Sequence, residues 1–177
     1  MSEEKIKLVE YDPAWLENFE RLKSIYLESL GDKLIKVEHV GSTAVPGLCA
    51  KPQLDIDLVI EDYSSFEDVI HALAELGYEY QGDFGIEGRE AFGREDRLAP
   101  WDGSNSRKQS HNLYVCPKNS RELRRHLAFR DRLREDEECR KRYADLKRRL
   151  VRKYRDNREA YTEGKTKFIE RVLEEIM

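Results

Sequence analysis

Cysteine is scarce in this chain, and long apolar runs are missing. The three cysteines among 177 residues, Cys49, Cys116 and Cys139, are odd in number, far apart and outside any CxxC or Cys/His spacing. Neither a disulfide framework nor a zinc site is supported, which favours a reducing, cytoplasmic compartment. No apolar stretch approaches the length of a membrane span, and residues 1–5 are polar where an export signal would be basic and then apolar. We therefore expect no export and no membrane insertion.

Charge is abundant and unevenly distributed. The length predicts a single domain over residues 1–177, in which an α/β core of residues 1–117 carries a helical C-terminal part of residues 118–177. The core holds 12 Lys and Arg against 23 Asp and Glu, a net charge of −11, and the helical part holds 20 against 13, a net +7. Such a split can place a basic helical surface beside an acidic pocket, although charged helices more often face the solvent.

Hydrophobic periodicity predicts alternating helices and strands up to Pro117. Asp12 and Pro13 precede the first helical pattern as a cap and a first helical residue, and Ser64 and Ser65 offer caps for the second. Strands are expected where β-branched and aromatic residues alternate or run together. The expected elements are helices over residues 14–30 and 66–76, and strands over residues 34–40, 53–60, 78–81, 89–92 and 111–116.

The rest of the chain divides into a long loop and a helical region. Apart from the short strand over 89–92, residues 82–110 contain five glycines and scattered charges, which predicts a long loop of functional importance or mobility. After residue 117 every periodic segment is helical, with apolar stripes over residues 123–133, 143–154 and 168–176. Strands that alternate with helices before a run of helices predict an α+β fold with a helical C-terminal part.

Asp55 and Asp57 are the candidate metal ligands. They stand two positions apart in the apolar stretch of residues 52–60, so an extended strand directs both side chains to one face. Two carboxylates this close do not both stay ionised in an apolar setting without a cation or donors, and Mg²⁺ prefers carboxylate and phosphate oxygens. We therefore expect a Mg²⁺ site there, with a half-exposed strand that turns polar residues outward as the alternative.

Candidate phosphate ligands follow the first expected strand. Gly41 permits close backbone approach, Ser42 can offer its hydroxyl and N–H groups to a phosphate, and Thr43 adds another donor. A simple helix cap is the alternative for such residues. Lys51 lies close in sequence to the aspartates and either neutralises a phosphate or stands at the surface without a special role.

An extended motif links these residues. Residues 38–48 read EHVGSTAVPGL, and AKP at 50–52 and DID at 55–57 follow. This run resembles the signature of the GrpB family (UPF0157), whose members are uncharacterised. The resemblance extends to YDPAW at residues 11–15, to FRD at 129–131 and to the C-terminal helical region. It therefore covers nearly the whole chain, and in that region it rests on Tyr161, Thr162, Lys165, Phe168 and Ile169.

The GrpB family is similar to the nucleotidyltransferase superfamily of DNA polymerase beta. The resemblance implies a mixed β-sheet flanked by helices, Mg²⁺ as cofactor, and a nucleotide or another phosphorylated small molecule as ligand. Gly41 and Ser42 would then hold triphosphate oxygens. Asp55 and Asp57 would ligate two metal ions that align an attacking hydroxyl group with the α-phosphate, and pyrophosphate would leave.

The third carboxylate of that superfamily has no obvious counterpart. Catalytic members take it from a later strand, but residues 110–115 read SHNLYV. Glu90 either supplies the missing oxygen from a neighbouring strand or forms an exposed salt bridge to a nearby arginine. His111 or Asn112 would otherwise face the ligand without catalysing anything. Two functions are therefore expected: transfer of a nucleoside monophosphate to a hydroxyl acceptor, or a binding module that keeps the phosphate pocket without turnover.

Basic residues suggest two further interpretations. Helices over residues 121–155 interleave Tyr143 and Tyr154 with Arg and Lys, as a nucleic-acid-binding surface would. We rank nucleic acid lowest among the partners, because the periodic leucines and tyrosines are explained by packing against the sheet. Basic residues of the expected loop either close over a polyanion or face the solvent; they are Arg89, Arg94, Arg97, Arg107 and Lys108.

Overall fold

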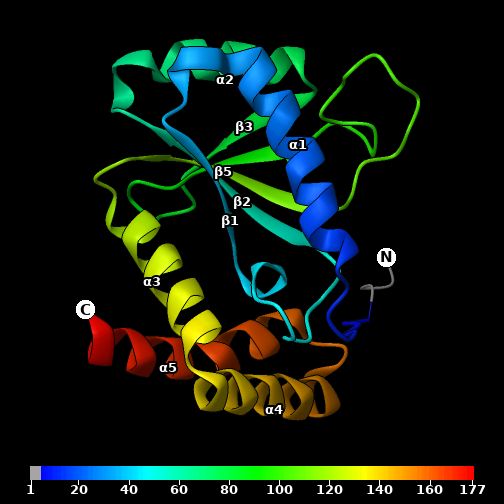
Figure 1. The fold of residues 1–177 in the computed structure, drawn as a ribbon, viewed down its shortest axis with the longest axis vertical. Coiled ribbons are helices and arrows are strands. Elements are labelled where there is room, and N and C mark those ends of the chain that lie inside the picture. The colour runs from blue at the N-terminus through cyan, green and yellow to red at the C-terminus, as the bar shows by residue number, and fades with distance from the viewer. Residues whose placement is uncertain (1–4) are drawn as a thin grey trace.

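A computed structural model of the protein describes residues 5–177 (Figure 1). Its centre is a mixed five-stranded sheet made of β1 (Lys36–Val40), β2 (Leu54–Ile60), β3 (Tyr78–Gly82), β4 (Glu90–Arg94) and β5 (His111–Pro117). The order across the sheet is β1-β2-β5-β4-β3. Only β2 and β5 are parallel, and every other neighbouring pair is antiparallel. These strands confirm the five predicted ones, and every strand end agrees with its predicted position to within two residues.

Within residues 5–177, five α-helices surround the sheet. Three short 3₁₀ turns, Gly31–Lys33, Ser42–Ala44 and Tyr63–Ser65, lie in the connections. In Figure 1, α2 lies at the top and the C-terminal helices lie together at the bottom. This arrangement confirms the predicted α+β class with a helical C-terminal part. The helices are α1 (Ala14–Leu30), α2 (Phe66–Glu75), α3 (Arg121–Glu135), α4 (Glu137–Tyr154) and α5 (Arg158–Ile176).

The positions of the two predicted helix starts are confirmed, but only one of the two predicted caps makes the expected side-chain hydrogen bond. The Asp12 carboxylate accepts a hydrogen bond from the Ala14 N–H at 2.9 Å, as a capping residue does. At the second helix, Asp62 accepts from the Ser64 N–H at 2.8 Å, and Ser65 makes no side-chain cap bond. The capping oxygen therefore comes from the aspartate before the two serines, which favours a 3₁₀ turn ahead of α2.

Strand β2 separates two environments. Its even-numbered residues Leu54, Ile56, Leu58 and Ile60 are buried in the main core, together with residues of α1 and α2. Its odd-numbered residues point to the other face, where Val59 packs with Leu123 of α3. The alternation of a strand thus places the two aspartates opposite the main core and beneath the C-terminal helices.

A second apolar core joins the connection between β1 and β2 to the C-terminal helices. Val45, Leu48 and Cys49 are at most 1% exposed. They pack against helices α3, α4 and α5, which supply Leu133, Cys139, Tyr143, Ala144 and Val172. Because its apolar residues lie inside this cluster, the β1–β2 connection cannot move independently of the helices.

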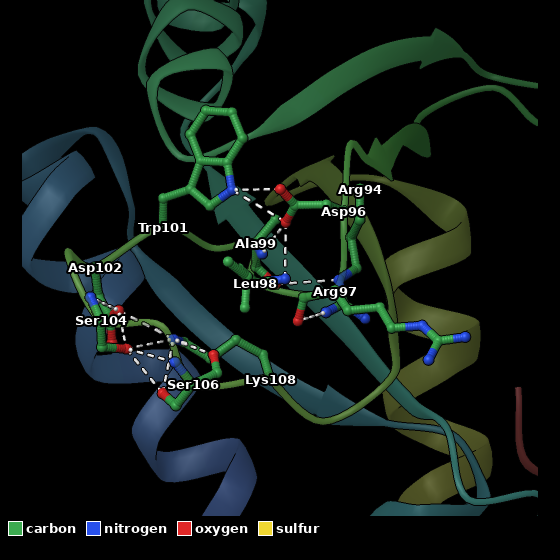
Figure 2. Close-up of polar contacts among 10 residues, drawn as sticks. All are labelled: Arg94, Asp96, Arg97, Leu98, Ala99, Trp101, Asp102, Ser104, Ser106 and Lys108. Atoms are coloured by element: carbon green, nitrogen blue, oxygen red, sulfur yellow. Dashed lines mark hydrogen bonds and ion pairs between the residues drawn. The ribbon is translucent and has the colours of Figure 1, made fainter.

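Part of the predicted 82–110 loop is ordered by its own polar contacts (Figure 2). Asp96 accepts hydrogen bonds from the N–H groups of Leu98 and Ala99 and from the Trp101 indole. Lys108 donates to Asp102 at 3.0 Å. Such Asx-type bonds fix a connection that has no regular secondary structure.

Among the helices within residues 5–177, none has the length and apolar character needed to cross a bilayer.

A buried chain of polar groups crosses the main core. His111 Nδ1 donates to the Gln109 carbonyl at 2.6 Å, which leaves its Nε2 to accept from the Tyr78 hydroxyl at 2.6 Å. The Tyr26 hydroxyl then donates to that of Tyr78, also at 2.6 Å. Burial lowers the pKa of His111 to about 4, which keeps the imidazole neutral, as this chain requires.

We predict that Tyr78→Phe destabilises the fold, because it removes the hydroxyl shared by Tyr26 and His111 and leaves these two buried groups only the longer 3.3 Å contact between them. The expected loss is about 1–3 kcal/mol in the free energy of unfolding, measured by urea denaturation. Tyr11→Phe is the matched control, since this half-buried ring also packs against the main core. Equal losses for the two variants would contradict the network.

Candidate functional site

A cavity of about 430 Å³ lies between the sheet and the C-terminal helices. Gly41, Ser42 and Asp55 line it from the sheet side, and His126 and Lys165 line it from α3 and α5. Three of the predicted site residues are therefore brought together around one space. Asp57 lies directly behind this lining, because its carboxylate contacts His126.

Two features require glycine at position 41: the backbone conformation there and the closeness of the Asp55 carboxylate. Its φ of 74° and ψ of −173° lie in a region that residues with side chains rarely adopt. A Cβ atom at this position would lie 2.3 Å from Asp55 Oδ2. The bare backbone therefore lets the Gly41-Ser42 turn pack directly against the carboxylate at the mouth of the cavity.

Asp55 is held from the side by an amide. In the β2–β5 register it is paired with Asn112, whose Nδ2 donates to Asp55 Oδ1 at 2.9 Å. Burial raises the pKa of Asp55, and the charge of Asp57 adds to this effect, while the Asn112 hydrogen bond opposes it. A carboxylate that is costly to ionise alone gains from a cation at its free oxygen.

Asp57 is fully buried, with 0% exposure, and only one of its oxygens has a protein partner. His126 Nδ1 donates to Oδ2 at 2.6 Å, whereas Oδ1 is buried without any hydrogen bond. Burial alone would lower the pKa of His126, but the hydrogen bond and charge of Asp57 raise it. A buried carboxylate oxygen without a donor is a position where a metal ion would be satisfied.

Arg89, directly before β4, and Lys165 of α5 add positive charge to the cavity lining. Arg89 lies 4.5 Å from the Tyr114 ring centroid, and its Nε is buried without a hydrogen-bond partner. Burial lowers the pKa of Lys165 to about 8, and Asp55 acts against this decrease. Neither residue forms an ion pair with a carboxylate in the described part of the chain. Arg125, by contrast, is bridged to Glu122 and Glu170.

The remaining three predicted site residues, Thr43, Lys51 and Glu90, do not line the cavity. The Thr43 hydroxyl is buried and pairs with His39 Nε2 at 2.9 Å. Lys51 Nζ lies 5.9 Å from the ring centroid of Tyr161 and is absent from the cavity lining. Neither side chain is therefore placed to meet a ligand in the cavity, although their backbones flank the site.

Glu90 points to the opposite face of the sheet. It is paired with Val115, whose side chain lies in the main core, and its carboxylate accepts hydrogen bonds from the hydroxyls of Tyr63 (2.7 Å) and Tyr80 (2.6 Å). Glu90 is thus 7% exposed and bound to tyrosines, not to an arginine. The β4–β5 register explains this orientation and removes Glu90 from the candidate ligands.

No third acid replaces it. Within residues 5–177, no group of three or more His, Cys, Asp and Glu side chains is arranged to hold a metal ion. The position on β5 beside Asp55 is occupied by the Asn112 amide, which donates a hydrogen bond where a carboxylate would bind a cation. Strand β2 therefore offers two carboxylates, which suit one divalent ion better than two, because the other acids that line the cavity, Glu122 and Glu170, are paired with Arg125.

The basic segments are largely occupied elsewhere. Arg94 donates to the carbonyls of Ala99 and Arg97, and Lys108 contacts Asp102, so these side chains shape the loop in Figure 2. On the C-terminal helices, a separate hollow of about 580 Å³ is open between α4 and α5. Its basic lining is made of Arg142, Arg149, Lys167 and Arg171.

Comparison of folds assigns the class. The protein superposes on Cid1 poly(U) polymerase, solved with MgGTP bound, with a TM-score of 0.51 and 12% sequence identity over 82% of this chain and 43% of that one. Together with the mixed sheet and its flanking helices, this likeness identifies a nucleotidyltransferase-like α+β fold.

The chain belongs to the GrpB family, because the GrpB protein model matches residues 5–175. The crystal structure of the conserved protein GrpB from Enterococcus faecalis is 34% identical, covers 96% of both chains and superposes with a TM-score of 0.79. The UPF0157 protein BH1888 of Halalkalibacterium halodurans is 35% identical over 168 residues, which are 95% of this chain and 80% of that protein. The resemblance seen in the sequence is thereby confirmed.

We predict that Gly41→Ala disrupts the cavity whereas Gly47→Ala does not. Both glycines have positive φ, so both variants carry backbone strain of about 1–3 kcal/mol. Only at Gly41 does the new Cβ meet Asp55, because nothing lies within 4 Å of a Cβ at Gly47. Urea denaturation should therefore show a larger loss of unfolding free energy for Gly41→Ala. Similar losses would contradict the close contact between the turn and the carboxylate.

Proposed function

We propose that this protein binds a nucleoside triphosphate with Mg²⁺ in the cavity and transfers a nucleoside monophosphate to a hydroxyl acceptor. One observation carries the proposal. Two buried atoms of opposite charge, Asp57 Oδ1 directly behind the cavity lining and Nε of Arg89 within that lining, have no hydrogen-bond partner among residues 5–177. A metal ion together with a phosphate group would satisfy both, since each needs what the other component supplies.

The chain's own residues have distinct roles in this proposal. Asp55 and Asp57 would hold the cation, and Ser42 would donate its hydroxyl proton to a phosphate oxygen. Lys165 from α5 and Arg89 from the residue before β4 would attract the polyphosphate, because neither is neutralised by a carboxylate within residues 5–177. When bound, Mg²⁺ would supply charge neutralisation at the phosphate oxygens. The like charges of the two aspartates would favour a cation between them.

A second candidate is a module that binds the nucleotide, or another phosphorylated small molecule, without turnover. The Asn112 amide favours it, because this residue stands beside Asp55 where a third acid would complete a two-metal site. Both candidates require the same cavity and the same aspartates. They differ only in whether pyrophosphate is released.

We predict that Asp55→Asn removes Mg²⁺-dependent nucleotide binding. Losing a charged ligand should weaken the affinity for a non-hydrolysable triphosphate by roughly 10- to 100-fold, measured by calorimetry with and without Mg²⁺. Asp156→Asn is the control, since Asp156 is exposed in the turn before α5. Mg²⁺-dependent binding by wild type that Asp55→Asn leaves unchanged would refute this site.

Pyrophosphate release separates the two candidates. Wild-type protein incubated with labelled triphosphates, Mg²⁺ and candidate hydroxyl acceptors should release pyrophosphate if it is a transferase, and Asp55→Asn should not. Retention of the triphosphate without release, over the acceptors tested, would favour the binding module.

We predict that Asn112→Asp makes stability depend on Mg²⁺. Without the ion, the new carboxylate loses the hydrogen bond to Asp55 and repels it, which should cost about 1–3 kcal/mol of unfolding free energy. Saturating Mg²⁺ should restore most of this loss, because three carboxylates then surround the cation. Asn112→Ala loses the same hydrogen bond and provides the control. Equal recovery by both variants would show that the cation binds elsewhere.

A further inference from the structure

Lys147 is a buried cation directly beneath the Ser42 turn. It belongs to α4, and 2% of it is exposed. Its Nζ donates to Ser42 Oγ at 2.9 Å and to the Cys49 carbonyl, and it lies 4.9 Å from the Tyr143 ring centroid. Within residues 5–177 it forms no ion pair. An ammonium group is thus enclosed by a hydroxyl, a carbonyl and a ring, with no carboxylate to neutralise it.

This burial is costly, so a positive charge here calls for a reason. Burial lowers the pKa of Lys147 to about 7, the Cys49 thiol acts against this, and Lys165, Arg148 and Lys51 lower the pKa further. A methionine of similar length would fill the same space without a desolvation penalty. The charge is therefore better explained by an anion that binds nearby than by packing.

The hydrogen bond between Lys147 and Ser42 has a definite direction. An ammonium group has donors only, so Ser42 Oγ must accept from Lys147, and the hydroxyl proton of Ser42 must point elsewhere. Ser42 lines the cavity beside Tyr143, with which it shares a hydrogen bond, so that proton points either to the Tyr143 oxygen or to a ligand in the cavity. A neutral amine can instead accept from Ser42, and the hydroxyl proton then turns away from the cavity.

We propose that Lys147 is a positioning residue that directs the Ser42 hydroxyl proton toward a bound phosphate, so that its protonation state sets the affinity for the polyphosphate. This inference rests on the proposed nucleotide site and adds its regulation by protons. The ligand class is an anionic phosphate ester or polyphosphate, because only an acceptor gains from both the Ser42 proton and the buried positive charge.

The sign of the pH dependence follows from the charged state. Lys147 is protonated at low pH, so affinity is highest there and falls as pH rises through about 7. A bound anion favours the ammonium form, which moves this fall to a higher pH in the complex. Lys165 also titrates, with a pKa lowered to about 8, and it lines the cavity itself. The experiment must therefore separate the two lysines.

The test compares wild type, Lys147→Met and Lys165→Met at a series of pH values from roughly 6 to 9. The probe is a non-hydrolysable ATP analogue with Mg²⁺, and its own titration cancels when variants are compared at the same pH. Wild type should bind about 10-fold more tightly than Lys147→Met at the low end, and the two should converge at the high end. Lys165→Met should bind more weakly below about pH 8, where Lys165 is protonated, and keep the Lys147-dependent fall near pH 7.

Two further variants separate positioning from simple support. Because Lys147 acts through Ser42, Ser42→Ala and Lys147→Met should not be additive in a double-mutant cycle. Lys147→Arg keeps a permanent charge, so it should lose the fall near pH 7 and keep only the dependence that Lys165 causes near pH 8. A Lys147→Met curve that stays parallel to wild type at every pH would overturn the inference, as would additive effects with Ser42→Ala.

Failure of this inference differs from failure of the nucleotide site. If wild type does not bind the analogue at any pH, both proposals are wrong. If wild type binds and Asp55→Asn does not, but Lys147→Met matches wild type, only the positioning role is wrong. Circular dichroism and urea denaturation verify folding, and Lys147→Met should be at least as stable as wild type because no buried charge remains.

Discussion

Burial of the β1–β2 connection among the C-terminal helices is the constraint on which the site depends. Val45, Leu48 and Cys49 are enclosed by residues of α3, α4 and α5, so the preceding Gly41-Ser42 turn cannot shift without opening that core. This packing holds the turn against Asp55 on one side and Lys147 on the other. Apolar contacts far from any ligand thereby position the polar groups of the cavity.

In the folded protein, the acidic and the basic parts of the sequence meet at the cavity. The aspartates come from β2, in the acidic part of the chain, whereas His126, Lys147 and Lys165 come from the basic C-terminal helices. The two parts meet around the cavity, where Arg89 and Lys165 lack a carboxylate partner within residues 5–177. The basic C-terminal helices therefore include a buried cation, Lys147, and two half-buried ones, His126 and Lys165, that line the cavity.

The sequence predicted the elements well because their signals are local. Helix 14–30 and the strand with Asp55 and Asp57 follow from caps and alternation within a few residues. Glu90 was misjudged because its direction depends on the β4–β5 register, which no local pattern reveals. Lys147 and His126 were missed because they reach the site from 105 and 69 residues away. A lysine between Tyr143 and Leu150, on the apolar stripe of α4, was the one available clue.

The ammonium group beneath the turn also bears on how this protein can be dissected. A fragment that ends near residue 117 would keep all five strands, yet it would lack the cation that orients Ser42 and the imidazole that covers Asp57. Its β1–β2 connection would expose three apolar residues to water. The sheet and the C-terminal helices thus share one apolar core and depend on each other for its burial. Neither part is suited to be used alone in engineering or in fragment complementation.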